Sequence, residues 1–170
     1  MDVVYEDDYL AIINKDKNVI VHPTETIYSD TLVNYLMYNF ENLSDVDGDY
    51  RRGIVHRLDK DTTGLIIIAK DNDTHLKLKE IIKNHEITKT YLCIVHGKID
   101  ECGTIEEYMT RNPKDRKKMM VSDEGKLSVS HYERLDYNDD YSLVKVQIKT
   151  GRTHQIRVHM NYIPVSYTHL

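Results

Sequence analysis

An aspartate stands between two apolar runs in the segment IVHRLDKDTTGLIIIAK, which extends from Ile54 to Lys70. The apolar runs predict rigid elements, so Asp59 is expected on a short connection that exposes its side chain while the flanks fix its position. A carboxylate held in this way suits nucleophilic or general-base chemistry. On spacing alone, an aspartate that caps the turn from Asp61 to Gly64 is the commoner explanation.

Cations gather in a second segment, KVQIKTGRTHQIRVHM, from Lys145 to Met160, which contains no carboxylate. Arg152 and Arg157 would need an anion if they pointed inward, and either a protein carboxylate or an RNA phosphate would supply one. Two surface arginines are the structural alternative.

Three histidines, His56, His154 and His159, could suggest a zinc site, because imidazole is a common zinc ligand. His154 and His159 are five residues apart, which on a helix places them off a common face. No cysteine or glutamate completes a ligand set of known spacing. We therefore expect no metal.

Apolar runs rich in β-branched residues predict the strands that would position these side chains. The predicted strands are Leu10 to Asn14, Val19 to His22, Leu65 to Lys70, Thr90 to His96, Leu127 to Leu135 and Leu143 to Lys149. The first two runs flank a polar turn, Lys15 to Asn18, and are expected to form a hairpin. In the last run Val144, Val146 and Ile148 share one face.

Apolar residues recurring with a period near 3.6 predict two helices. They are Leu32, Val33, Leu36, Met37 and Phe40 in the first helix and Leu78, Ile81 and Ile82 in the second. Ser29 or Asp30 is the expected cap of the first helix, and Asp73 that of the second. The acidic stretch from Ser44 to Asp49 lacks an apolar period and is expected to be a loop.

A third helix is expected after the turn at Thr150 and Gly151, because Ile156, Met160 and Ile163 recur at helical spacing. This spacing places His154 and Arg157 together on a neighbouring face. Strands outnumber helices in this assignment. The pattern indicates an α+β fold, with a mixed, mostly antiparallel sheet and flanking helices.

The composition is that of a globular protein, with 30% charged and 40% apolar residues in a chain of 170. This length suits one domain with a substantial core. The longest aliphatic stretch, Leu65 to Ala69, is too short to span a bilayer, and the acidic amino terminus is unlike a secretory signal, so we expect a cytoplasmic protein. Cys93 and Cys102 lack CxxC spacing, which favours thiols over a disulfide or a metal site.

Charge is unevenly distributed along the chain. The net charge is -5, yet residues 1–50 carry eleven acids and only two lysines, so the remainder is net basic. The stretch from Arg111 to Lys118 places five basic side chains around a single acid, Asp115. Such a cluster supports nucleic-acid binding without proving it, because it also suits a solvated loop.

The motifs together resemble the RluA-type pseudouridine synthases. HRLDKDTTG, which contains Asp59, resembles the HRLD-x-x-TSG signature of that family, with Thr63 in place of its serine. TGRTHQIRVH resembles a later family motif, and the KTY that begins at Lys89 resembles a third. The opening YEDDYLAIINKDKNVIVHP resembles the first family motif, although Asp16 and Asn18 replace a usual proline and glycine.

This resemblance implies an RNA pseudouridine synthase that breaks the C1'–N1 bond of uridine, turns the uracil and rejoins it through C5, without cofactor or metal. Asp59 would be the catalytic carboxylate. Arg157 would pair with that carboxylate and keep it charged. Tyr91 would pack on the target base and could accept the C5 proton, although ordinary strand packing is its alternative.

The resemblance also implies RNA contacts. Arg57 would occupy the gap left by a flipped uridine, and His56 would contact phosphate or serve as a structural histidine. The remaining expected phosphate contacts are Arg111, Lys114, Arg116, Lys117 and Lys118 of a basic hairpin, and Arg152. Met119 to Val121 and the Glu124-Gly125 turn would complete this hairpin.

The resemblance ends near Ile163, so residues 1–163 are expected to form an incomplete catalytic domain and 164–170 an atypical tail. A non-catalytic RNA-binding remnant of the same fold is the alternative function. The expected partner is ribosomal or transfer RNA, with no membrane, and the expected state is a monomer.

Overall fold

The computed structural model describes residues 1–163, so the expected tail, 164–170, lies outside the described part. The contacts within the chain group it into two compact units, Met1–Glu86 and Ile87–Leu170. Each unit has its own antiparallel sheet. The assignment of residues 1–163 to one catalytic domain stays a prediction.

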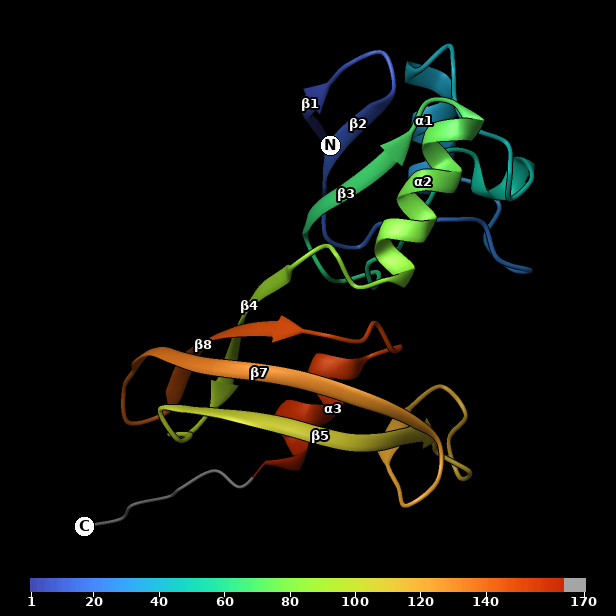
Figure 1. Cartoon of the computed structure of the whole chain (residues 1–170). Coiled ribbons are helices and arrows are strands. Elements are labelled where there is room, and N and C mark those ends of the chain that lie inside the picture. The colour runs from blue at the N-terminus through green and yellow to red at the C-terminus, as the bar shows by residue number, and fades with distance from the viewer. Residues whose placement is uncertain (164–170) are drawn as a thin grey trace. The chain divides into compact units, whose positions relative to one another are not determined.

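The first unit contains a three-stranded sheet in the order β1-β2-β3 (Figure 1). The strands are β1 (Asp2–Glu6), β2 (Leu10–Lys15) and β3 (Gly64–Ala69). In β2 the buried positions are Ala11, Ile13 and Lys15, which alternate and therefore share one face. A lysine thus occupies a position where this alternation predicts an apolar residue.

The predicted hairpin between Leu10–Asn14 and Val19–His22 is wrong. β2 pairs with β1 on one side and β3 on the other, so neither of its edges is open to a further strand. Val19 to Val21 run outside the sheet instead, and the carbonyls of Ile20 and Val21 accept the Leu32 and Val33 amides of the first helix. β1 was not predicted from the sequence, because its five residues are all exposed and show no buried face.

Helix α1 (Leu32–Asn39) is where the sequence predicts it, but its cap is Thr31 rather than Ser29 or Asp30. Thr31 and Asn34 form a reciprocal capping box, in which each side chain accepts the other's backbone amide. The helix buries Leu32, Val33 and Leu36.

Helix α2 (Asn72–Lys83) packs against β3, and its cap is Asp71 rather than Asp73. The Asp71 carboxylate accepts the Thr74 amide at 2.8 Å. The predicted loop from Ser44 to Asp49 is confirmed, apart from a short 3-10 turn at Asp49–Arg51. The amide side chain of Asn72 holds this loop by accepting the Ser44 hydroxyl at 2.8 Å.

The second unit contains a five-stranded sheet in the order β4-β8-β7-β5-β6, covered on one face by α3 (Figure 1). Its elements are β4 (Lys89–His96), β5 (Cys102–Arg111), β6 (Met119–Val121), β7 (Lys126–Tyr137), β8 (Tyr141–Ile148) and α3 (Gln155–Tyr162). β4, β7, β8 and α3 agree with the sequence prediction, as does β3 in the first unit. β5 was not predicted.

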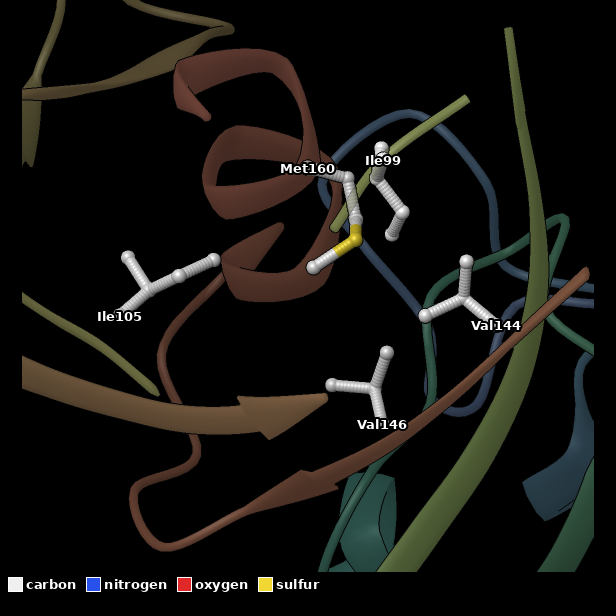
Figure 2. Packing of buried hydrophobic residues seen from close by; sticks show 5 residues of the cluster. All are labelled: Ile99, Ile105, Val144, Val146 and Met160. Atoms are coloured by element: carbon white, nitrogen blue, oxygen red, sulfur yellow. The ribbon is translucent and has the colours of Figure 1, made fainter. Parts of the chain in front are cut away.

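The core of this unit lies between α3 and the sheet, where the buried residues are Ile99, Ile105, Val144, Val146 and Met160. Figure 2 shows Met160 of α3 pointing toward Val144 and Val146 of β8. Ile148 packs against the same cluster, so the predicted shared face of β8 is confirmed.

The α+β class and the antiparallel character of the fold are confirmed, since every strand pair among residues 1–163 is antiparallel. No helix in that part of the chain is both long and apolar enough to cross a membrane.

Candidate active site and RNA-binding residues

Asp59 lies on a short turn that leads into β3. Its carbonyl accepts the Thr62 amide at 3.1 Å, and the preceding Leu58 is buried. The Asp59 side chain is half-buried. The main chain of Asp59 therefore closes the turn, while a buried neighbour anchors the position from which the carboxylate projects.

The segment before Asp59 is attached along β3. Ile54 forms an isolated antiparallel bridge with Ile68, and the Ile67 amide donates to Nε2 of His56 at 2.9 Å. In this contact Nε2 acts as the acceptor, which fixes the orientation of the ring against β3. His56 thus has a structural contact, and its predicted contact with phosphate stays a prediction.

Close approach to β3 also requires a glycine at position 53. Gly53 has a φ of +72°, and an added Cβ would lie 2.8 Å from Cγ2 of Ile68. Its amide and carbonyl bond to Ser44 and Ala69, which places the strand end and the acidic loop around it. The backbone leading to Asp59 is therefore constrained well before the turn.

Lys15 is the residue of this site that sequence reasoning missed. Its side chain is fully buried, and its ammonium donates to the carbonyls of Asp16 at 2.8 Å, Val19 at 2.9 Å and Lys60 at 3.0 Å. Lys60 directly follows Asp59, so this ammonium ties the turn to the segment after β2. The sequence feature that could have indicated its burial is the alternation of Ala11, Ile13 and Lys15, which places the lysine on the inward face of β2.

Burial lowers the pKa of Lys15, because the charged ammonium is removed from water. The negative charges of Asp61, Asp16 and Asp59 act in the opposite direction, but burial is the larger effect. The charge of Asp59 therefore acts on the pKa of Lys15 within the first unit.

Positive charge gathers nearby around His22. Burial lowers the pKa of His22, and the charges of Arg57 and Arg51 lower it further. The Arg57 side chain is exposed, as a residue expected to enter RNA must be. Arg51 was not among the residues that the sequence indicated.

In the second unit Tyr91 lies on β4 opposite Val146 of β8. Its side chain is half-buried on the face that also carries Cys93 and Val95, which pack against the core. Burial raises the pKa of the Cys93 thiol, in agreement with an unreactive cysteine at this position.

The TGRTHQIR segment is organised by Gln155, which sequence reasoning also missed. The side-chain oxygen of Gln155 accepts the Thr150 hydroxyl at 2.8 Å and the Arg152 amide at 3.0 Å. Its side-chain nitrogen donates to the Val129 carbonyl and the Ser130 hydroxyl. One buried amide thus fixes the loop after β8 to strand β7 and sets the start of α3.

Arg157 lies on α3 with an exposed side chain, and His154 occupies the position just before the helix with a left-handed φ of +56°. His159 is fully buried, and its Nδ1 lies 2.9 Å from the Ser130 hydroxyl. Burial lowers the pKa of His159. No cluster of three potential metal ligands occurs among residues 1–163.

The predicted basic hairpin is formed by β5 and β6, which pair through Arg111 and Met119. The exposed cations around its tip are Arg111, Lys114, Arg116, Lys117 and Lys118. Asn112 shapes the tip by accepting the Lys114 amide at 2.8 Å, and Arg111 donates to the Arg116 carbonyl. Arg152, also exposed, donates to the Leu127 carbonyl at 3.3 Å.

The model of the RNA pseudouridylate synthase family matches residues 9–162. The chain belongs to this family. The matched range includes both long motifs, HRLDKDTTG and TGRTHQIRVH, and therefore both units of the structure. The family resemblance drawn from those motifs is confirmed.

Family members of known sequence are similar over nearly the whole chain. An uncharacterised RNA pseudouridine synthase of Bacillus subtilis is 44% identical over 96% of this chain and 54% of its own length. The ribosomal large subunit pseudouridine synthase D of Pseudomonas aeruginosa is 42% identical over 96% of this chain and 50% of its own length. This chain thus spans about half the length of the curated relatives it matches.

Solved structures from the family have a similar fold. Human RNA pseudouridylate synthase domain containing 1 has a TM-score of 0.75 and 25% identity, with 92% of this chain and 62% of that chain covered. Human RNA pseudouridylate synthase domain containing 4 has a TM-score of 0.72 at the same identity, with 94% of this chain and 63% of that chain covered. The similarity of fold to these two proteins therefore agrees with the family to which the sequence belongs.

Proposed function

We propose that the protein converts uridine to pseudouridine in RNA, with Asp59 as the catalytic carboxylate. The observation that carries this proposal is the family match across residues 9–162, which includes an aspartate on a turn held by buried contacts. Attachment of the preceding segment to β3 and the Lys15 contact to Lys60 restrict where the carboxylate can move. Such restriction is what a catalytic group requires.

The proposed reaction is an isomerisation. The C1'–N1 bond of uridine breaks, the uracil turns while bound, and a C1'–C5 bond forms. C5 then loses its proton and N1 gains one, so the product has the formula of the substrate. Asp59 acts on the ribose as nucleophile or as base, and both roles require the ionised carboxylate.

The roles of the other expected catalytic residues belong to the same proposal. Tyr91 packs on the target base and is the candidate acceptor of the C5 proton. Arg157 supplies the positive charge that keeps a catalytic carboxylate ionised. Neither role calls for a cofactor or a metal ion.

RNA would be held mainly through its backbone. The exposed cations at the β5–β6 hairpin tip, together with Arg152, suit contacts to phosphate, which position RNA without reading its sequence. Arg57 would fill the space left by the flipped uridine, since a stacked base cannot reach a catalytic group. His56 adds a further candidate contact to phosphate.

We place the substrate among ribosomal or transfer RNAs. The relatives named ribosomal large subunit pseudouridine synthase D, such as that of Escherichia coli at 40% identity, favour ribosomal RNA. We also propose that the protein acts as a cytoplasmic monomer. Light scattering after size exclusion would detect a dimer, and pseudouridine mapping in a deletion strain would identify the target.

The decisive test compares Asp59→Asn with Asp61→Asn, an exposed acid two residues further along. Each purified variant is incubated with bulk RNA, and pseudouridine is mapped by carbodiimide labelling and primer extension. Asp59→Asn should abolish product while its circular dichroism stays that of the parent protein. Asp61→Asn should retain product.

Pseudouridine formation by folded Asp59→Asn would refute the assignment of the carboxylate. RNA binding by the unsubstituted chain without any product would instead favour the alternative, a non-catalytic RNA-binding protein of the same fold.

A further inference from the structure

Lys89 begins β4 two residues before Tyr91 and therefore on the same face of the strand. This face continues through Cys93 and Val95 into the core of the second unit, whereas Thr90 between the two side chains is exposed. Residues two apart on a strand are separated by about 6.6 Å. Lys89 thus lies about one nucleotide's length from Tyr91, at the end of the face that α3 covers.

The Lys89 ammonium extends to the loop after β8. Its Nζ lies 4.0 Å from the position that a Cβ at Gly151 would occupy, so the ammonium lies beside this loop. The loop is fixed on both sides of Gly151, because Gln155 accepts the Thr150 hydroxyl and the Arg152 amide. The ammonium therefore lies beside a backbone segment that is fixed on both sides.

The surroundings of this ammonium are poor in negative charge. The Lys89 side chain is half-buried, and burial lowers its pKa. The chain from Tyr141 to Ile163, which supplies β8, the loop and α3, contains no carboxylate at all. A cation that has lost part of its hydration is stabilised when an anionic ligand arrives.

We propose that Lys89 binds a backbone phosphate of the RNA substrate, adjacent to the nucleotide whose base packs on Tyr91. This inference rests on the proposed function. An ammonium is a compact charge with three donors, which suits a phosphate approached from one side. The phosphate would lie over Gly151, where no side chain blocks it.

The test measures the binding of a fluorescein-labelled hairpin RNA with unpaired uridines, by fluorescence anisotropy over a series of salt concentrations. Lys89→Gln should weaken binding about tenfold at low salt. It should also reduce the slope of log K against log salt by about 0.7, the value for one phosphate of a single strand. Lys89→Arg should keep the slope of the parent protein.

The matched control is Lys145→Gln. Lys145 lies on β8 in the same sheet, but its ammonium already pairs with the Glu133 carboxylate at 2.5 Å. This variant should bind RNA as the parent protein does. Denaturation midpoints of both variants should equal that of the parent, which would exclude misfolding as the cause.

An unchanged salt slope in Lys89→Gln would overturn the inference, as would an equal loss in Lys145→Gln. In turnover assays Lys89→Gln should raise KM and leave kcat unchanged, and the opposite pattern would also overturn it. Pseudouridine formation by the parent protein is measured separately. If the parent protein forms no pseudouridine, the proposed function is refuted. If the parent protein forms pseudouridine but Lys89→Gln binds RNA as tightly as the parent does, only the Lys89 inference is refuted.

Discussion

Replacement of the buried Lys15 by methionine should destabilise the first unit and loosen the turn that carries Asp59. The ammonium of Lys15 donates to three carbonyls, at 2.8, 2.9 and 3.0 Å, and its side chain has no solvent exposure. Methionine keeps most of the apolar volume but cannot donate a hydrogen bond. The substitution therefore isolates the contribution of the charged donor.

The expected loss follows from the three acceptors left behind. A buried acceptor without a partner costs about 1–3 kcal/mol, which gives roughly 3–9 kcal/mol if none is rehydrated. Removing a buried charge recovers part of this cost, because burial opposes the charged form of Lys15. We expect a net loss of about 3 kcal/mol, the lower end of that range.

The loss would be measured as the change in free energy of unfolding during urea denaturation, with Lys17→Met in the exposed turn as the control. Hydrogen exchange gives a local measurement. The Thr62 amide, which donates to the Asp59 carbonyl, should exchange faster in Lys15→Met, whereas the Val146 amide in the second unit should not. A loss below about 1 kcal/mol, a value typical of exposed ion pairs, would refute this account of Lys15.

Two further predictions concern the second unit. Gly125→Ala should lower the free energy of unfolding by at least about 2 kcal/mol more than Gly48→Ala. Both glycines have positive φ, but only at Gly125 would a Cβ collide with a backbone carbonyl, that of Met109. Equal losses of unfolding free energy in urea denaturation would contradict this prediction. Because burial lowers the pKa of His159, protons bind the unfolded state preferentially, and stability should fall as pH drops below about 6.5. His159→Asn should reduce this dependence of the unfolding free energy on pH and the exposed control His96→Gln should not, whereas an unchanged profile in His159→Asn would assign the dependence to other groups.

Much of the fold and the family could be predicted from local sequence. The aliphatic runs of β3, β4 and β8 are long enough to identify strands without knowledge of their partners. The motifs around Asp59 and Arg157 lie in the range that the family model matches. Motifs of this kind can be recognised in a sequence because several polar and charged residues follow one another in a fixed order.

The helix caps illustrate a limit of local reasoning. Three capping residues precede α1 in succession, Ser29, Asp30 and Thr31, and each could accept an amide of the first turn. Asp30 has a left-handed φ of +59°, whereas Thr31 has the extended backbone that a cap requires. Backbone path, and not side-chain chemistry, decided between them.

The partners of β2 and the position of Lys15 were decided only by tertiary structure. Local sequence predicts a strand at β2 but cannot say that β1 and β3 occupy both of its edges. A lysine on the inward face is costly until carbonyls from distant residues surround it, and Lys60 is 45 residues away in the chain. Local motifs therefore identify Asp59 as the candidate catalytic carboxylate, whereas the buried hydrogen bonds that hold its turn depend on contacts that exist only after folding.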